Sequence, residues 1–222
     1  MAQEVIHSLQ TGAARPPAPQ EQTDNHGVYE LKSLNPRSLP GLRAQGRRVL
    51  IRDTNRQRAR HMHSGDVFLG AQSGTRPWDA VADADRLGAA DALIVDLLVR
   101  RLSRCSPAPF ARVHQTLEAC MQRLPHRRHT IADLFELLRN PPDKTGAPWT
   151  AECVAGALDC LQPLYGLACT SRGRPFTITA WPRGVVVWLD GDDVSAAFVH
   201  LAGVAANHGV IGDVELYTTS PL

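Results

Sequence analysis

The chain has 222 residues, of which 43% are hydrophobic and 21% are charged, and its formal net charge is +2. These values predict an ordinary soluble protein that can bury a core. The longest strongly apolar run, residues 185–189, is far too short to span a bilayer. The first ten residues lack the basic start and apolar stretch of a signal peptide. The five cysteines suggest no disulfide framework, so we expect a cytoplasmic protein.

Residues 1–28 are rich in proline and glutamine and predict a disordered leader, because they cannot bury enough apolar surface to offset their ordering entropy. Residues 47–53 then combine an apolar run with β-branched side chains and predict a buried strand. Residues 66–69 predict a second, shorter strand, which is bounded by Gly65 and Gly70.

A helical block follows these two strands. Apolar residues at three- and four-residue steps predict one amphipathic helix over residues 83–104, and a second helix runs from Val113 to Leu124. Thr130 followed by Asp133 is typical of a capping box that starts a third helix. Thr150 is expected to cap a fourth helix.

The pattern then returns to strands at residues 176–179 and 184–189, before a last helix that starts near Asp192 or Asp193. This order predicts an α/β layer that is interrupted by an all-helical insertion. We expect residues 29–82 and 172–222 to form the α/β core, and residues 83–171 to form the insertion domain.

Cysteine and histidine give no signature of a metal site. The five cysteines contain no C-x-x-C pair, and their odd number argues against a disulfide framework. Cys153 and Cys160 lie seven residues apart and are expected on one buried helix face. His61 and His63 would point the same way on a strand but lack a third ligand. A Cys/His nucleophile pair stays open, because such partners can lie far apart in sequence.

The family resemblance is carried by the order of residues 42–53, 64–69, 76–79, 129–138, 175–181 and 187–189. Together these stretches resemble the TraD-like type IV secretion coupling proteins of bacterial conjugation. The likeness covers roughly residues 40–205. Residues 42–53 look like the strand that follows the P-loop in this family and ends on an aspartate, here Asp53. The resemblance implies a partial RecA-like layer, ATP and Mg²⁺ as the family's cofactors, hexameric rings, and an inner-membrane anchor that precedes the matching region.

The sequence departs from this family at its ATPase motifs. No Gly-x-x-x-x-Gly-Lys-Ser/Thr occurs, and the only two lysines, Lys32 and Lys144, do not follow glycine-rich turns. A P-loop needs glycine-freed amides around the phosphates and a lysine to neutralise their charge. The family's Asp-x-x-Gly turn is present only as residues 53–56, where Arg56 replaces the glycine. The second ATPase motif would lie beyond the position that matches Leu222. We therefore expect no nucleotide cofactor and no ATP hydrolysis.

Arginine makes up nearly all of the 24 basic residues, and it clusters in two places. Such clusters suit salt-dependent contacts with DNA phosphates. A solvated loop is nevertheless the favoured interpretation, because aromatic stacking partners are missing. The candidate nucleic-acid-binding residues are Arg47, Arg48, Arg52, Arg56, Arg58, Arg60, Arg123, Arg127 and Arg128.

The acidic run Asp190, Asp192 and Asp193 allows a metal site, since hard cations prefer clustered carboxylates. A helix cap at Asp192 or Asp193 is the simpler interpretation, so we expect no catalytic residue and no metal ligand.

The leading hypothesis is a non-hydrolysing homologue or fragment of a coupling protein that contacts DNA, a relaxase or secretion components and forms homo-oligomers. The alternatives are a ligand-free protein-interaction module, a metal-dependent hydrolase that uses the three aspartates, and a gene remnant without activity.

Overall fold

The computed structural model describes residues 32–71, 74–93, 108–123, 130–140, 149–170 and 173–219. Its centre is a five-stranded parallel sheet with the strand order β1-β5-β2-β4-β3. The α/β class predicted from the sequence is confirmed. The strands are β1 (Lys32–Ser33), β2 (Arg48–Arg52), β3 (Val67–Leu69), β4 (Val186–Leu189) and β5 (Val214–Thr218).

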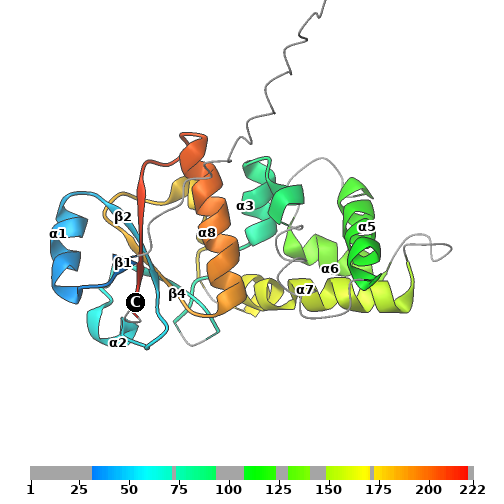
Figure 1. Cartoon of the computed structure of the whole chain (residues 1–222), viewed down its shortest axis with the longest axis horizontal. Coiled ribbons are helices and arrows are strands. Elements are labelled where there is room, and N and C mark those ends of the chain that lie inside the picture. The colour runs from blue at the N-terminus through cyan, green and yellow to red at the C-terminus, as the bar shows by residue number, and fades with distance from the viewer. Residues whose placement is uncertain are drawn as a thin grey trace, which may run out of the picture.

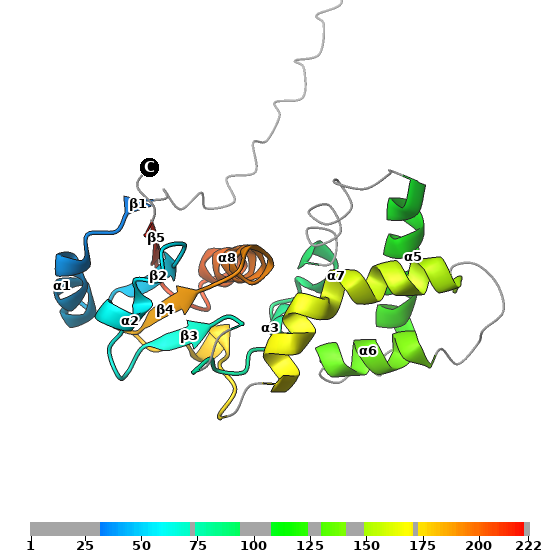
Figure 2. The ribbon, with the colours of Figure 1, turned by 90° about the horizontal axis from the view of Figure 1, so that it is seen from below.

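Helices lie on both faces of the sheet and also form a group at one end of the molecule. The α-helices are α1 (Leu39–Ala44), α2 (Arg58–His61), α3 (Ala80–Arg86), α5 (Ala108–Arg123), α6 (Ile131–Arg139), α7 (Ala151–Thr170) and α8 (Asp192–Asn207). Figure 1 shows α5, α6 and α7 gathered at the end opposite the sheet, with α8 and α3 between them and the strands. Figure 2 shows α1 and α2 on the other side of the sheet from α8.

The two faces of the sheet bury different side chains, because successive residues of a strand point in opposite directions. Leu50 and Val187 face α8 and belong to a large core that also holds residues of α5, α6 and α7. Val49, Ile51 and Trp188 face α1 and form a smaller core with Leu39 and Phe68. The sheet is therefore covered on both sides, as parallel sheets generally are.

The caps of the helical block follow the sequence-based expectation. Thr130 and Asp133 form a complete capping box at the start of α6, and the Thr150 hydroxyl accepts the Cys153 N–H at 3.3 Å at the start of α7. Cys153 and Cys160 are both buried on α7, as their spacing predicted.

The single helix predicted over residues 83–104 is wrong in its described part. Helix α3 begins earlier, at Ala80, and ends at Arg86. Gly88 then adopts a φ of 66°, a left-handed conformation that glycine tolerates and that ends a helix. A helical turn resumes at residues 90–93. The continuous apolar pattern did not reveal this break, and residues 94–107 lie outside the described residues.

The strand predicted at residues 176–179 is also wrong. Phe176 forms only an isolated bridge with Trp78, and the next residues make a 3-10 helix, Ile178–Ala180. The cause is a buried side chain far away in sequence: the Asp83 carboxylate accepts the Ile178 N–H at 2.8 Å, which bends the segment away from the sheet. Strands β1 and β5, by contrast, were not predicted.

Candidate functional site

The carboxyl ends of β2, β4 and β3 bring three residues together on one face of the sheet. Asp53 follows β2, Asp190 follows β4, and Gly70 follows β3. The register pairs Arg52 with Leu189, so the two aspartates come next in adjacent strands and point to the same side. At Gly70 a Cβ atom would lie 2.7 Å from the Asp190 Cβ, which leaves no room for a larger residue there.

This edge is a topological switch point. The chain leaves β2 towards α2 on one face of the sheet and leaves β4 towards α8 on the other, as Figures 1 and 2 show. In open α/β sheets, ligands bind in the crevice that such diverging connections leave at the carboxyl ends of the strands. Figure 1 shows α2 and the start of α8 at the same end of the sheet as the label of the C-terminus.

Asp53 organises the loop between β2 and α2. It is 6% exposed. Its carboxylate accepts the backbone N–H groups of Gln57 at 2.7 Å and Arg58 at 3.0 Å, and the Thr219 hydroxyl donates to it at 3.4 Å. The amides that follow β2 therefore already bind an anionic group, which belongs to the chain itself.

Thr219, at the end of β5, holds the same loop from a second side. Its hydroxyl accepts the Asn55 N–H at 3.0 Å, and its carbonyl accepts the Asn55 side-chain amide at 2.8 Å. Sequence reasoning missed Thr219, because nothing in the local pattern links it to a loop more than 160 residues away.

One arginine of this loop and the first residue of α2 reach the crevice. Arg56 has a φ of 54°, the only positive φ among the non-glycine residues that the structure describes. The Arg58 guanidinium lies 3.4 Å from the centre of the Phe68 ring, a close cation–π contact. Together they border a cavity of about 170 Å³ that is lined by Asp53, Arg56, Arg58, Ala59, Phe68 and Asp190.

The first basic cluster, predicted as one run, is divided between the two edges of the sheet. Arg47 and Arg48 lie at the amino end of β2, whereas Arg52, Arg56, Arg58 and Arg60 lie at or beyond its carboxyl end. Arg47 contacts Glu215 at 3.1 Å, and this carboxylate also accepts the Tyr217 hydroxyl at 2.7 Å. Burial, followed by the hydrogen bond to Glu215, raises the pKa of Tyr217 to about 12.

Arg48 is also engaged at the amino edge. Its Nε donates to the Trp181 carbonyl at 2.9 Å. Burial and the neighbouring charge of Arg183 lower the pKa of Arg48 from its usual value. Arg47 and Arg48 therefore hold the amino edge together rather than extend the basic surface of the carboxyl edge.

At the carboxyl edge the arginines differ in what they contact. Arg52 lies 3.5 Å from the exposed Asp192 carboxylate, whereas Arg56 and Arg60 are exposed and form no ion pair with any residue of the described ranges. His61 ends α2, and its carbonyl accepts the Arg43 guanidinium N–H at 3.4 Å, next to Asp66 at the start of β3. The pair His61 and His63 does not lie on a strand, contrary to the geometry considered for it.

The second arginine cluster is only partly covered by the residues that the structure describes. Arg123 is the last residue of α5, and Arg127 and Arg128 lie outside the described residues. Figure 1 shows α5 at the end of the molecule that is far from the carboxyl edge of the sheet. Among the described residues, the basic group at the carboxyl edge of the sheet therefore consists of four arginines, Arg52, Arg56, Arg58 and Arg60.

The acidic run, residues 190–193, is not arranged as a metal site in the described part of the chain. Gly191, not an aspartate, occupies the N-cap of α8 and makes no side-chain capping bond, so the expected cap at Asp192 or Asp193 is wrong. Both aspartates lie in the first turn, where they favour the positive end of the helix dipole. Within the described part of the chain, no group of three or more His, Cys, Asp or Glu side chains is arranged to hold a metal ion.

Comparisons with known proteins add no family to these observations. No protein-family model, no curated protein and no solved structure matches the chain. Among the described residues, no helix combines the length and the apolar character that crossing a membrane requires.

Proposed function

We propose that this protein contacts DNA phosphates through the carboxyl edge of its sheet and does not hydrolyse ATP, as a non-hydrolysing relative of conjugative coupling proteins would. The observation that carries the proposal is the group of Arg52, Arg56, Arg58 and Arg60 on one edge. Two of its members, Arg56 and Arg60, are exposed and form no ion pair in the described ranges.

Exposed guanidinium groups suit DNA for a physical reason. Each one can replace a counterion that is condensed on a phosphate, so binding gains free energy from the released ion and weakens as salt rises. Arginine also donates two parallel hydrogen bonds to one phosphate. Contacts of this kind do not distinguish one base sequence from another, so they would let the protein bind DNA of any sequence.

The geometry after β2 supports the absence of hydrolysis. In a P-loop the amides that follow the strand surround the phosphates of the nucleotide. Here the Gln57 and Arg58 amides donate to the Asp53 carboxylate, and a phosphate at this place would meet a buried negative charge instead of free donors.

The loop also supports the likeness to coupling proteins. The family's turn after this strand carries a glycine at the position of Arg56, and glycine is the residue that commonly adopts positive φ. Arg56 has this conformation, with a φ of 54°. The turn thus has the backbone shape that a glycine at this position would favour and presents a guanidinium in its place.

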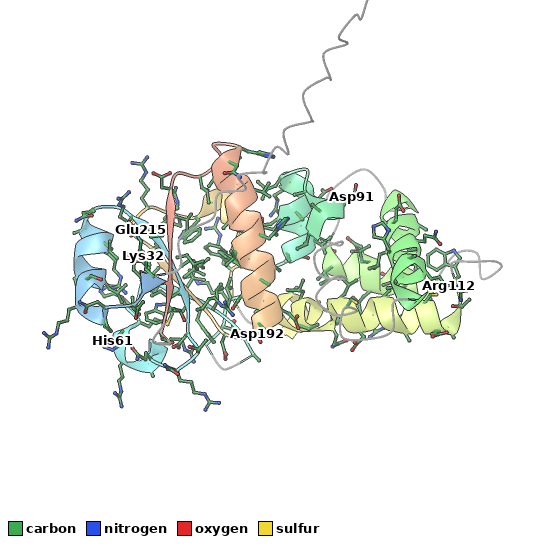
Figure 3. The ribbon with its side chains drawn as sticks, viewed as in Figure 1. Lys32, His61, Asp91, Arg112, Asp192 and Glu215 are labelled. Carbon is green, nitrogen blue, oxygen red and sulfur yellow. The ribbon has the colours of Figure 1, made fainter. Side chains whose placement is uncertain are left out.

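A salt series on the full chain tests the DNA contact. We expect fluorescence anisotropy to show binding to a mixed-sequence duplex at low salt, with log Kd rising linearly with log salt concentration. Arg60→Ala should weaken binding to every sequence alike and reduce the slope by about 1. The matched control is Arg112→Ala, since Arg112 is an exposed arginine on α5 at the far end of the molecule (Figure 3).

Three results would contradict the proposal. An absence of binding at low salt, or an equal loss in Arg112→Ala and Arg60→Ala, would remove the DNA contact at the carboxyl edge. Micromolar ATP affinity in calorimetry of the wild-type protein would overturn the claim that the chain does not use a nucleotide.

A further inference from the structure

We propose that the partner at the carboxyl edge is double-stranded rather than single-stranded DNA, and that Arg37 contacts its phosphates together with Arg56 and Arg60. This inference rests on the proposed DNA contact and specifies the ligand of that same surface. Arg37 belongs to neither of the two arginine clusters that the sequence shows. The pairing of the strands brings it to this edge.

The strand register places Arg37 and Arg56 at the same edge of the sheet. Ser33 of β1 and Arg52 of β2 both pair with Thr218 of β5, and the three strands run parallel. Arg37 and Arg56 each come four residues after the paired residue of their own strand. Both arginines therefore follow the carboxyl end of a strand, although β5 separates the two strands from each other.

Arg37, Arg56 and Arg60 share the property that a phosphate contact needs. All three are exposed, and in the part of the chain that the structure describes none of them makes an ion pair. The Asn35 side chain accepts the Arg37 backbone N–H at 3.1 Å, a bond that does not involve the guanidinium. Arg58 is not counted with them, because its guanidinium already lies over an aromatic ring.

The spacing of the strands favours two lines of phosphates over one. Because β5 lies between β1 and β2, the chain leaves the sheet towards Arg37 and towards Arg56 at points about 10 Å apart. The grooves of B-DNA are about 6 and 12 Å wide, so arginines at this separation can reach phosphates on both strands of a duplex. A single strand offers one line of phosphates and releases fewer counterions per contact.

In its described residues, the edge also lacks the surface that proteins commonly use for single strands. Such proteins stack the bases on exposed aromatic side chains. Phe68, Trp188 and Tyr217, which belong to strands of this sheet, are all buried. No aromatic residue is exposed among those whose side chains the structure describes. Binding would therefore depend on phosphates, whose charge density is higher in a duplex.

Asp192 limits the DNA to the side of the edge that carries α1 and α2. This residue is exposed, lies in the first turn of α8 and is 3.5 Å from Arg52 (Figure 3). Its negative charge repels phosphates and partly neutralises the arginine. The three exposed arginines belong instead to α2 or to the segments that lead into α1 and α2, which Figure 2 shows on the other side of the sheet from α8.

Fluorescence anisotropy of the full chain with a mixed-sequence duplex, and with one of its two strands alone, tests the inference. At the same low salt we expect the duplex to bind with an about tenfold lower Kd, and its log Kd to rise more steeply with log salt concentration. A single strand that binds as tightly as the duplex would overturn this inference and leave the DNA contact itself in place.

Variants of Arg37 locate the additional contact. Arg37→Ala should raise the Kd for the duplex and reduce the salt slope by about 1, with a smaller effect on the single strand. Arg37→Lys keeps the charge and should retain the slope. The matched control Arg112→Ala removes an exposed arginine of α5 and should change neither quantity.

A variant of Asp192 tests the side on which the DNA lies. Asp192→Asn removes the repelling charge and releases Arg52, so the Kd for the duplex should fall about twofold. An unchanged or higher Kd would contradict the position of the DNA on the side of α1 and α2.

The remaining outcomes distinguish this inference from the proposed function. A loss of duplex affinity in Arg60→Ala but not in Arg37→Ala would show that the DNA does not reach Arg37, and would overturn this inference alone. No binding of either form of DNA at low salt would remove the proposed DNA contact and this inference together.

Discussion

At the scale of single residues, buried aspartates hold the structure together. The Asp66 carboxylate pairs with Arg43 and also accepts the His63 N–H at 2.8 Å and the Trp188 indole N–H at 3.3 Å. Asp83 is fully buried and accepts the Trp78 indole N–H at 2.9 Å. Each carboxylate satisfies donors that would otherwise be buried without a partner, which is costly.

Asp79 joins two helices through one carboxylate. It accepts the Ala82 N–H at 2.9 Å as the N-cap of α3, and its two oxygens also accept the Ile131 N–H of α6 at 3.2 and 3.1 Å. Burial raises the pKa of Asp79 above its usual value, and the charge of Asp83 adds to this effect, while the hydrogen bonds from the amides oppose it. Ionisation of this group is therefore harder in the folded protein than in the unfolded chain.

This raised pKa makes stability depend on pH with a definite sign. The folded state holds the proton more tightly, so the contribution of Asp79 is fully present below the unfolded pKa of about 4 and is lost as pH rises through the folded pKa. Asp79→Asn resembles the protonated form and removes the titration. We expect urea denaturation to show the wild type losing free energy of unfolding relative to this variant as pH rises through that window. A constant difference across the series would contradict the assignment.

At the scale of elements, the capping box of α6 contributes measurably to the free energy of unfolding. Thr130 accepts the Asp133 N–H, and the Asp133 carboxylate accepts the Thr130 N–H at 3.1 Å. Thr130→Ala leaves one helix donor without its partner and should lower the free energy of unfolding by about 1 kcal/mol in urea denaturation. Thr177→Ala is the matched control, because Thr177 is the N-cap of a 3-10 helix but makes no capping bond. An equal loss in both variants would mean that the hydroxyl acts through packing.

The elements also show which parts of the fold a sequence can predict. β2 and β4 were predicted because buried parallel strands are short apolar runs, and α6 because its cap is local. The segment at residues 176–179 was not, because its shape depends on Asp83, nearly a hundred residues away. β1 has only two residues, both exposed, and so carries no apolar pattern.

The candidate site was predictable to a smaller extent. The arginines were visible in the sequence as a basic cluster, but its division between two edges follows from the direction of β2 through the sheet. The positions of Asp53 and Asp190 beside each other depend on strand order, which no local pattern reveals. The role of Thr219 depends on the same long-range pairing.

At the scale of the whole molecule, one large core connects the sheet to the helical group. Leu117 of α5, Leu134 of α6 and Leu161 of α7 belong to the same cluster of buried residues as Leu50 of β2 and Val187 of β4. The sequence predicts that residues 83–171 form a separate domain, and a separate domain would unfold independently of the α/β part. A continuous core favours unfolding in a single step.

Two spectroscopic signals can distinguish independent unfolding of the helical segment from unfolding in a single step. Trp78, Trp181 and Trp188 are buried near the sheet, so tryptophan fluorescence mainly follows the α/β part, whereas α5, α6 and α7 contribute much of the far-UV circular dichroism. We expect the two signals to change together in urea with one midpoint. Separate midpoints would instead show that the helical segment unfolds as an independent domain.

The backbone of Arg56 sets stability against the phosphate contact that we propose for its side chain. A left-handed φ costs a non-glycine residue about 1 kcal/mol or more relative to glycine. A selection for heat resistance alone would therefore favour glycine at this position and would discard a guanidinium group that borders the cavity. A more heat-resistant variant obtained by laboratory evolution is accordingly expected to lose the proposed phosphate contact at this turn first.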